Sequence, residues 1–148
     1  MKENMVVLKR GMFCIALFIF VFTAGVCFAD DGIPNIVGTW IVRADGAVLV
    51  KGANQGQKTH HSGEFSALTA EVIVDKQQGR MLRGTFKSAR ATENFVAAIG
   101  LDNKSFFYAD EDGVLEGKIV NKDKIDVIYR HVTTLDTVIG VGTWTRKK

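Results

Sequence analysis

The apolar residues of this chain fall in short runs with a period of two, and polar turns separate the runs. The runs recur at intervals of about 8 to 12 residues, a spacing typical of all-β domains. Asp45-Gly46 lies between two apolar segments, where an Asp-Gly pair is a strong hairpin signal. No apolar helical period is long enough to require a helix, although residues 66–71 could form one turn. We therefore expect strands at residues 37–44, 47–51, 70–76, 81–88, 94–101, 105–109, 114–121, 124–133 and 137–146.

Two of these runs repeat one pattern, which indicates how the sheet curves. Met81-Leu82-Arg83-Gly84-Thr85-Phe86 and Val114-Leu115-Glu116-Gly117-Lys118-Ile119 each follow a glycine turn. In each run the leucine, the central glycine and the final apolar residue share one face of the strand. A glycine in the middle of an inner face suits the strongly bent wall of a barrel. We predict an all-β domain, an antiparallel up-and-down meander closed into a barrel of about eight strands. A two-layer β-sandwich is the alternative.

The motif Gly-Thr-Trp occurs near both ends of the predicted domain, as Gly38-Thr39-Trp40 and Gly142-Thr143-Trp144. Each copy lies in an apolar context that favours a strand. We expect these to be the two strands that meet when the sheet closes on itself.

Residues 1–29 have the pattern of a secretory signal peptide. The segment begins with basic residues, carries no charge from residue 11 to residue 29, and ends in small residues before Asp30. We expect cleavage before Asp30, one domain over residues 30–148, and an exported protein, periplasmic or extracellular. A retained N-terminal anchor is one alternative, since the apolar stretch could just span a bilayer. A lipoprotein modified at Cys27 is another, with Val26 where that signal prefers a smaller residue.

Removal of the leader changes what the composition implies. Both cysteines, Cys14 and Cys27, lie in the leader, so the predicted domain has no disulfide and no catalytic cysteine. Without Lys2, Lys9, Arg10 and Glu3, the 19 basic and 16 acidic residues become 16 and 15. A nearly neutral domain gives no argument for nucleic acid, which requires a clustered basic excess. We also expect no membrane association after cleavage.

These motifs together resemble the calycin superfamily, which includes lipocalins and avidin-like proteins. The resemblance rests on Gly38-Thr39-Trp40, the two Leu-x-Gly strands, the run Lys124-Ile125-Asp126-Val127-Ile128-Tyr129, and the closing Gly-x-Gly-Thr-Trp over residues 140–144. It implies that Trp40 plugs the closed end of a barrel under a basic side chain from a late strand, Arg130 or Arg146, with Trp144 on the adjoining strand. The chain lacks the Thr-Asp-Tyr motif, the C-terminal helix and the disulfide of classical lipocalins. Biotin binding is not implied, because avidin's set of biotin-contacting residues has no match here.

Candidate ligand-binding residues follow from which face of each strand points inward. Alternation places Ile125, Val127, Tyr129 and His131 on one face of a strand, and that face is the more apolar. Phe106 and Tyr108 share a face of another strand. We predict that Tyr129, His131, Tyr108 and Phe106 contact an apolar or aromatic small molecule at the open end of the barrel, with residues 52–63 as a lid. Ordinary core packing is the alternative, with backbone or water as the partner of the buried polar groups.

Other reactive residue types do not form a recognisable site. His60-His61 would need His131 or Glu64 nearby to bind a metal, so we expect a polar loop. Asp110-Glu111-Asp112-Gly113 resembles the start of a calcium loop, but the later ligands are missing, and we expect a hairpin turn. We assign no catalytic residue, metal or cofactor. Two other functions stay open: a protein-protein module, such as an enzyme inhibitor, that binds its partner through residues 52–63, and a calycin-like isomerase or cyclase that uses Tyr129 and His131.

Overall fold

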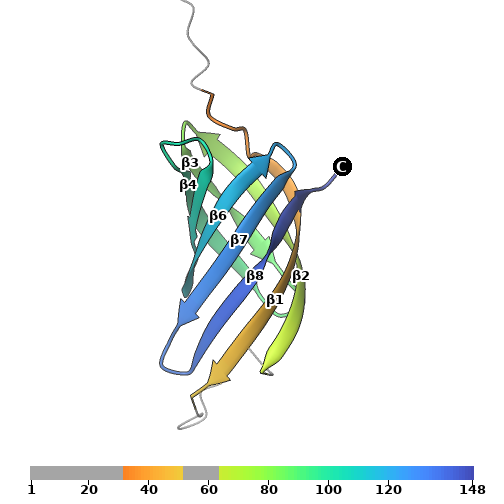
Figure 1. Cartoon of the computed structure of the whole chain (residues 1–148), viewed down its shortest axis with the longest axis vertical. Coiled ribbons are helices and arrows are strands. Elements are labelled where there is room, and N and C mark those ends of the chain that lie inside the picture. Colours follow the sequence, from red (N-terminus) through yellow and green to blue (C-terminus); the bar gives the residue numbers. More distant parts are fainter. Residues whose placement is uncertain (1–31, 52–63) are drawn as a thin grey trace, which may run out of the picture.

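The computed structural model describes residues 32–51 and 64–148, in which eight antiparallel strands close into a barrel (Figure 1). Each strand pairs with the next in the chain, and the last strand pairs with the first. This confirms the predicted up-and-down barrel. The strands are β1 (Gly38–Val50), β2 (Phe65–Gln78), β3 (Met81–Lys87), β4 (Thr92–Ile99), β5 (Ser105–Ala109), β6 (Gly113–Asn121), β7 (Lys124–Val132) and β8 (Asp136–Arg146).

The predicted hairpin at Asp45-Gly46 is wrong. β1 runs without interruption from Gly38 to Val50, so residues 47–51 are not a return strand. Asp45 lies opposite Ala67 on β2 and Val141 on β8, which means that β1 is paired on both sides at this point. A turn here would break the ladders with two strands, and those long-range pairings outweigh the local turn preference of Asp-Gly. Residues 66–71 belong to β2 and form no helical turn.

The two Gly-Thr-Trp motifs lie on neighbouring strands, as predicted. β1 and β8 pair with Trp40 opposite Arg146 and Val42 opposite Trp144. The antiparallel register therefore places the two tryptophans at different levels of the barrel. Trp144 is 1% exposed and lies in the interior, where its indole ring packs edge-on against Phe106 with a centroid distance of 5.3 Å.

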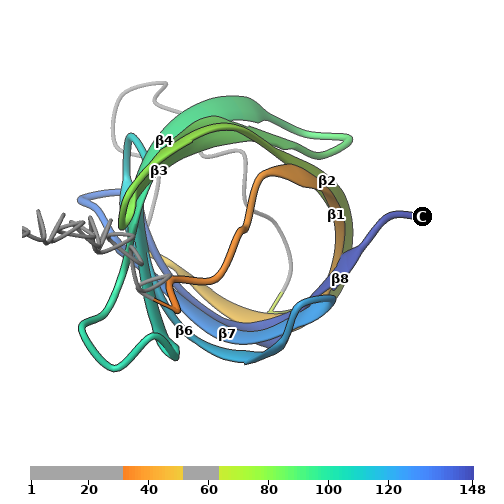
Figure 2. The same ribbon diagram turned by 90° about the horizontal axis from the view of Figure 1, so that it is seen from above.

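One end of the barrel is closed by the segment that precedes β1, which crosses the opening in Figure 2. Ile36 and Trp40 are both 0% exposed, and the Trp40 indole Nε1 donates a hydrogen bond to the Ile36 carbonyl at 3.0 Å. The Gln77 side chain accepts from the Ile36 amide at 2.9 Å and donates to the Pro34 carbonyl at 2.9 Å. These bonds hold the segment in place over the barrel core.

Arg146 covers Trp40 at this closed end. Its guanidinium carbon lies 4.3 Å from the Trp40 ring centroid, and its nitrogens donate to the carbonyls of Val37 at 2.8 Å and Asn35 at 2.9 Å. Gly38 has a φ of 136°, and a Cβ there would lie 2.8 Å from the Arg146 Nη1 atom, so this approach requires glycine. Arg130 lies elsewhere, on the outer wall, where it forms an ion pair with Glu116 at 3.0 Å.

The predicted leader, residues 1–29, and the predicted lid, residues 52–63 with His60-His61, lie outside the described residues. Within the described part of the chain, no helix has the length and apolar character needed to cross a membrane.

Candidate functional site

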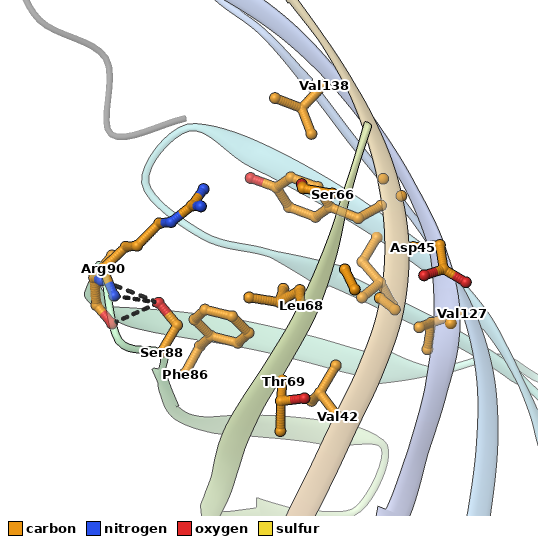
Figure 3. Close-up of a pocket in the computed structure, with 18 of the residues that line it drawn as sticks. Val42, Asp45, Ser66, Leu68, Thr69, Phe86, Ser88, Arg90, Val127 and Val138 are labelled. Atoms are coloured by element: carbon orange, nitrogen blue, oxygen red, sulfur yellow. Dashed lines mark hydrogen bonds between the residues drawn. The ribbon is translucent and has the colours of Figure 1, made fainter. Parts of the chain in front are cut away.

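The interior of the barrel opens into a cavity of about 340 Å³ at the end away from Trp40 (Figure 3). This volume is at the lower end of the range typical of small-molecule pockets. Val42 and Trp144, paired neighbours on β1 and β8, line the cavity on the side of the closed end. Much of the remaining wall is apolar and includes Leu68, Phe86, Leu115, Val127 and Val138.

The structure brings two of the four predicted ligand-binding residues to the cavity. Tyr108 and Tyr129 line it, from β5 and β7. Phe106 is 0% exposed and packs on Trp144 within the core, so it is not part of the cavity wall. His131 is 3% exposed and its ring centroid lies 6.4 Å from that of Tyr129, also outside the cavity lining. The inward orientation predicted for all four side chains agrees with their burial.

Each cavity tyrosine donates its hydroxyl proton to an aspartate of the turn between β5 and β6. Tyr108 donates to Asp110 Oδ2 at 2.8 Å, and Tyr129 donates to Asp112 Oδ1 at 3.1 Å. Burial, followed by the negative charge of Asp110, raises the pKa of both phenols above the ordinary value. Both hydroxyls therefore stay protonated at neutral pH and act as hydrogen-bond donors to the aspartates.

Residues 110–113 form the predicted hairpin turn, but their side chains also belong to the site. Asp110 Oδ1 accepts from the Gly113 amide at 2.7 Å and the Asp112 amide at 3.3 Å, which holds the turn closed. A side chain at position 113 would collide with the phenol ring of Tyr129. The turn sequence thus fixes both aspartates against the two tyrosines, a role that the turn signal alone does not reveal.

A third carboxylate, that of Glu93 on β4, completes an acidic cluster at the mouth of the cavity. One oxygen each of Glu93, Asp110 and Asp112 lie within 4.8 Å of one another, and all three residues are half-buried. Sequence reasoning missed Glu93. Strand alternation could have indicated it, because Glu93 lies on the same face of the strand as the inward-facing Phe95, Ala97 and Ile99.

The cluster alone is a poor match for a calcium site. It offers three oxygen ligands, whereas Ca²⁺ takes about six to eight. Two of the three carboxylates already accept hydrogen bonds from tyrosine hydroxyls. Arg90, an exposed cation on the turn between β3 and β4, lines the same mouth.

His131 connects this cluster to the turn between β7 and β8. Its Nε2 atom lies 2.6 Å from Asp136 Oδ1, and its Nδ1 atom lies 3.1 Å from Asp112 Oδ1. Asp136 is 1% exposed and also accepts a hydrogen bond from the Thr133 hydroxyl at 2.9 Å. The buried imidazole thus lies between two carboxylates, hydrogen-bonded to Asp136 and next to Asp112 at the cavity mouth.

The outer wall of the barrel carries a second, shallower hollow. It lies over β1, β2, β7 and β8 and is bordered by Phe65, Ile139 and Val141, which are 82%, 54% and 61% exposed. Ala47 on β1 pairs with Ile139 on one side and Phe65 on the other, so these apolar side chains are cross-strand neighbours. The two tyrosines and the acidic cluster lie outside the described lining of this hollow.

No protein-family model matches the chain, and no curated protein is significantly similar to it. The geometry of the site is therefore the basis for the function proposed below.

Proposed function

We propose that this protein is a small barrel that binds an apolar or aromatic small molecule in the open end of its interior. The observation that carries the proposal is the cavity of about 340 Å³, which has apolar walls and a few polar groups at its mouth. Specific pockets commonly combine a mainly apolar lining with a small number of placed polar groups. A barrel built only for stability would fill this space with side chains, because voids cost packing energy.

The aromatic lining supports a flat or apolar ligand. Trp144 and Tyr108 line the cavity with ring centroids 6.0 Å apart. The ring of Phe95, which is outside the described lining, packs against the ring of Tyr108 with a centroid distance of 4.5 Å. Rings held in this way keep their positions when a ligand enters, which limits the entropy lost on binding. The closed eight-stranded barrel is compatible with the resemblance to calycins, and that resemblance and export to the periplasm or the extracellular space are parts of the proposal.

Intrinsic tryptophan fluorescence tests the proposal, because the chain has two tryptophans and only one of them lines the cavity. The protein is purified from its natural host, native mass spectrometry searches for a copurifying ligand, and a panel of apolar and aromatic compounds is titrated. We expect a saturable change in fluorescence that persists in Trp40→Phe and disappears in Trp144→Phe. If no compound copurifies, and none changes either the fluorescence or the melting temperature, the proposal is wrong.

The other two functions are tested in the same material. A protein-protein module that uses residues 52–63 would give a specific partner in a pull-down, lost when those residues are deleted and retained in Tyr129→Ala. An isomerase or cyclase would need a cavity that is open and lined by convergent polar groups. The cavity with its acidic mouth meets that requirement, although the described lining includes no activated nucleophile in the form of a Ser-His or Cys-His pair.

A further inference from the structure

The tyrosines and carboxylates at the cavity mouth can act toward a ligand as hydrogen-bond acceptors. Tyr108 and Tyr129 use their hydroxyl protons on Asp110 and Asp112. The backbone amides of Asp112 and Gly113 are likewise directed at Asp110. What these tyrosines and carboxylates still offer a ligand is lone pairs, so a ligand group that binds to them must be a donor.

Negative charge predominates at this place. Three half-buried carboxylates have oxygens within 4.8 Å of one another, an arrangement that favours a positively charged group beside them. Beyond the effect of burial, Asp110, Asp112 and Glu93 all add to the raised pKa of Tyr129, which is a second sign of the negative potential around the phenols. Among the described residues, the cationic groups that adjoin the mouth are exposed Arg90 at the rim and, when protonated, the imidazole of His131 behind Asp112.

The same cavity is apolar away from this mouth. Leu68, Phe86 and Val138 form the wall seen in Figure 3, and Trp144 lines the cavity on the side of the closed end. A bare metal ion would leave that apolar volume unused, and an anion would be repelled by the carboxylates. A molecule with one positively charged donor group and an apolar body matches both regions at once.

We propose that the ligand is an amphiphilic organic cation, with an ammonium or amidinium group held by Glu93 and Asp110 and an apolar body lying against Trp144. This inference rests on the proposed function and adds the charge and the orientation of the ligand. Asp112, which accepts the hydrogen bond of the Tyr129 hydroxyl, contributes further negative charge.

Three ligands with the same chain and different head groups provide the test: octylamine, octanol and octanoate, each titrated by isothermal calorimetry at neutral pH and low salt. We expect octylamine to bind about tenfold more tightly than octanol, because the ammonium group adds ion-pair attraction to the hydrogen bond that a hydroxyl group can also donate to a carboxylate, and octanoate to bind most weakly. Added salt should narrow the difference between octylamine and octanol, because the mouth is open to solvent.

Matched variants then locate the preference. Glu93→Gln should reduce the preference for octylamine over octanol to about threefold or less, because octylamine loses an ion pair whereas octanol loses only the stronger of two possible hydrogen-bond acceptors. Glu116→Gln removes the same charge from the outer wall, where Glu116 pairs with Arg130, and should keep the full preference. The comparison of the three ligands on the unmodified protein remains decisive if Glu93→Gln does not fold.

The outcomes separate this inference from the proposed function. If octanol or octanoate binds as tightly as octylamine, the inference is overturned and the barrel is still a binding protein. If none of the three binds and the wider panel also fails, both proposals fall. If calcium chloride alone gives a heat of binding that Glu93→Gln abolishes, while octylamine shows no preference over octanol, the acidic cluster serves an inorganic ion and the inference is overturned.

Discussion

Replacement of Arg146 by methionine should destabilise the barrel strongly, because this one side chain of β8 contacts the closing segment, Trp40 and the turn between β6 and β7. Its guanidinium and Nε groups donate to the carbonyls of Asn35, Val37 and Lys122 at 2.8–2.9 Å while the side chain lies over Trp40. Methionine keeps a long apolar side chain above the ring and removes the donors and the charge.

The magnitude follows from the interactions that methionine cannot make. Hydrogen bonds from a charged donor contribute about 1.5–3 kcal/mol each, and the exposed carbonyls recover part of this through hydration. The cation-π contact adds about 0.5–1 kcal/mol. We expect a loss of about 3 kcal/mol in the free energy of unfolding. With a urea m-value of about 1.5 kcal/mol/M, the midpoint of unfolding should fall by about 2 M.

The assay is urea unfolding followed by circular dichroism, with Arg130→Met as the matched control. Arg130 pairs with Glu116 on the outer wall, with 48% of its side chain exposed, and pairs of this kind contribute about 1 kcal/mol or less. Equal shifts in the two variants, or no shift for Arg146→Met at an unchanged m-value, would refute the role given to Arg146. Octylamine binding at the opposite end should be retained in the folded variant.

Three further predictions concern the cavity, its tyrosines and the leader. Tyr108 and Tyr129 are the two tyrosines of the chain, and burial and the charge of Asp110 raise their pKa values. Unfolded tyrosine ionises near about pH 10, so the native protein should show little phenolate absorbance at 295 nm just above that pH. Because the raised pKa favours the neutral phenols in the fold, their contribution to stability is complete below about pH 10 and falls as pH rises. Ionisation of the tyrosines of the folded protein near pH 10 would contradict this prediction. Leu68→Trp should fill part of the cavity and weaken octylamine binding about tenfold or more, while the free energy of unfolding changes by less than about 1.5 kcal/mol. Undiminished affinity for octylamine would mean that the ligand lies elsewhere. N-terminal sequencing of the protein from its natural host should begin at Asp30; a start at Met1 or a lipid on Cys27 would replace the signal-peptide prediction with one of its alternatives.

The sequence predicted the strands well where one residue in two contacts the core. The runs at 105–109, 114–121 and 124–133 agree with β5, β6 and β7 to within one residue at each end, because turns and alternation are local properties. The inward face of β7 follows from the same alternation. Asp45-Gly46 failed because its local preference for a turn competes with two ladders formed by strands that are distant in the sequence.

The site was less predictable, because its members come from separate turns. Tyr108 and Tyr129 were found from their apolar faces, but nothing local connects Glu93 on β4 with Asp110 and Asp112 on the turn after β5. The choice between Arg130 and Arg146 also depends on position in the barrel. Both follow apolar runs, yet one meets Glu116 on the outer wall and the other reaches across to Trp40.

The sequence by itself therefore determined the class of fold, the meander of strands from β3 to β8 and the faces that turn inward, since each depends on neighbours within a few residues. The tertiary structure alone decided that the interior holds a cavity, that three carboxylates gather at its mouth, and that Trp40 and Trp144 occupy different levels of the core. The physical reason is closure: the register of β1 with β8 sets which side chains share a level, and the volume left between those side chains is a property of all eight strands together.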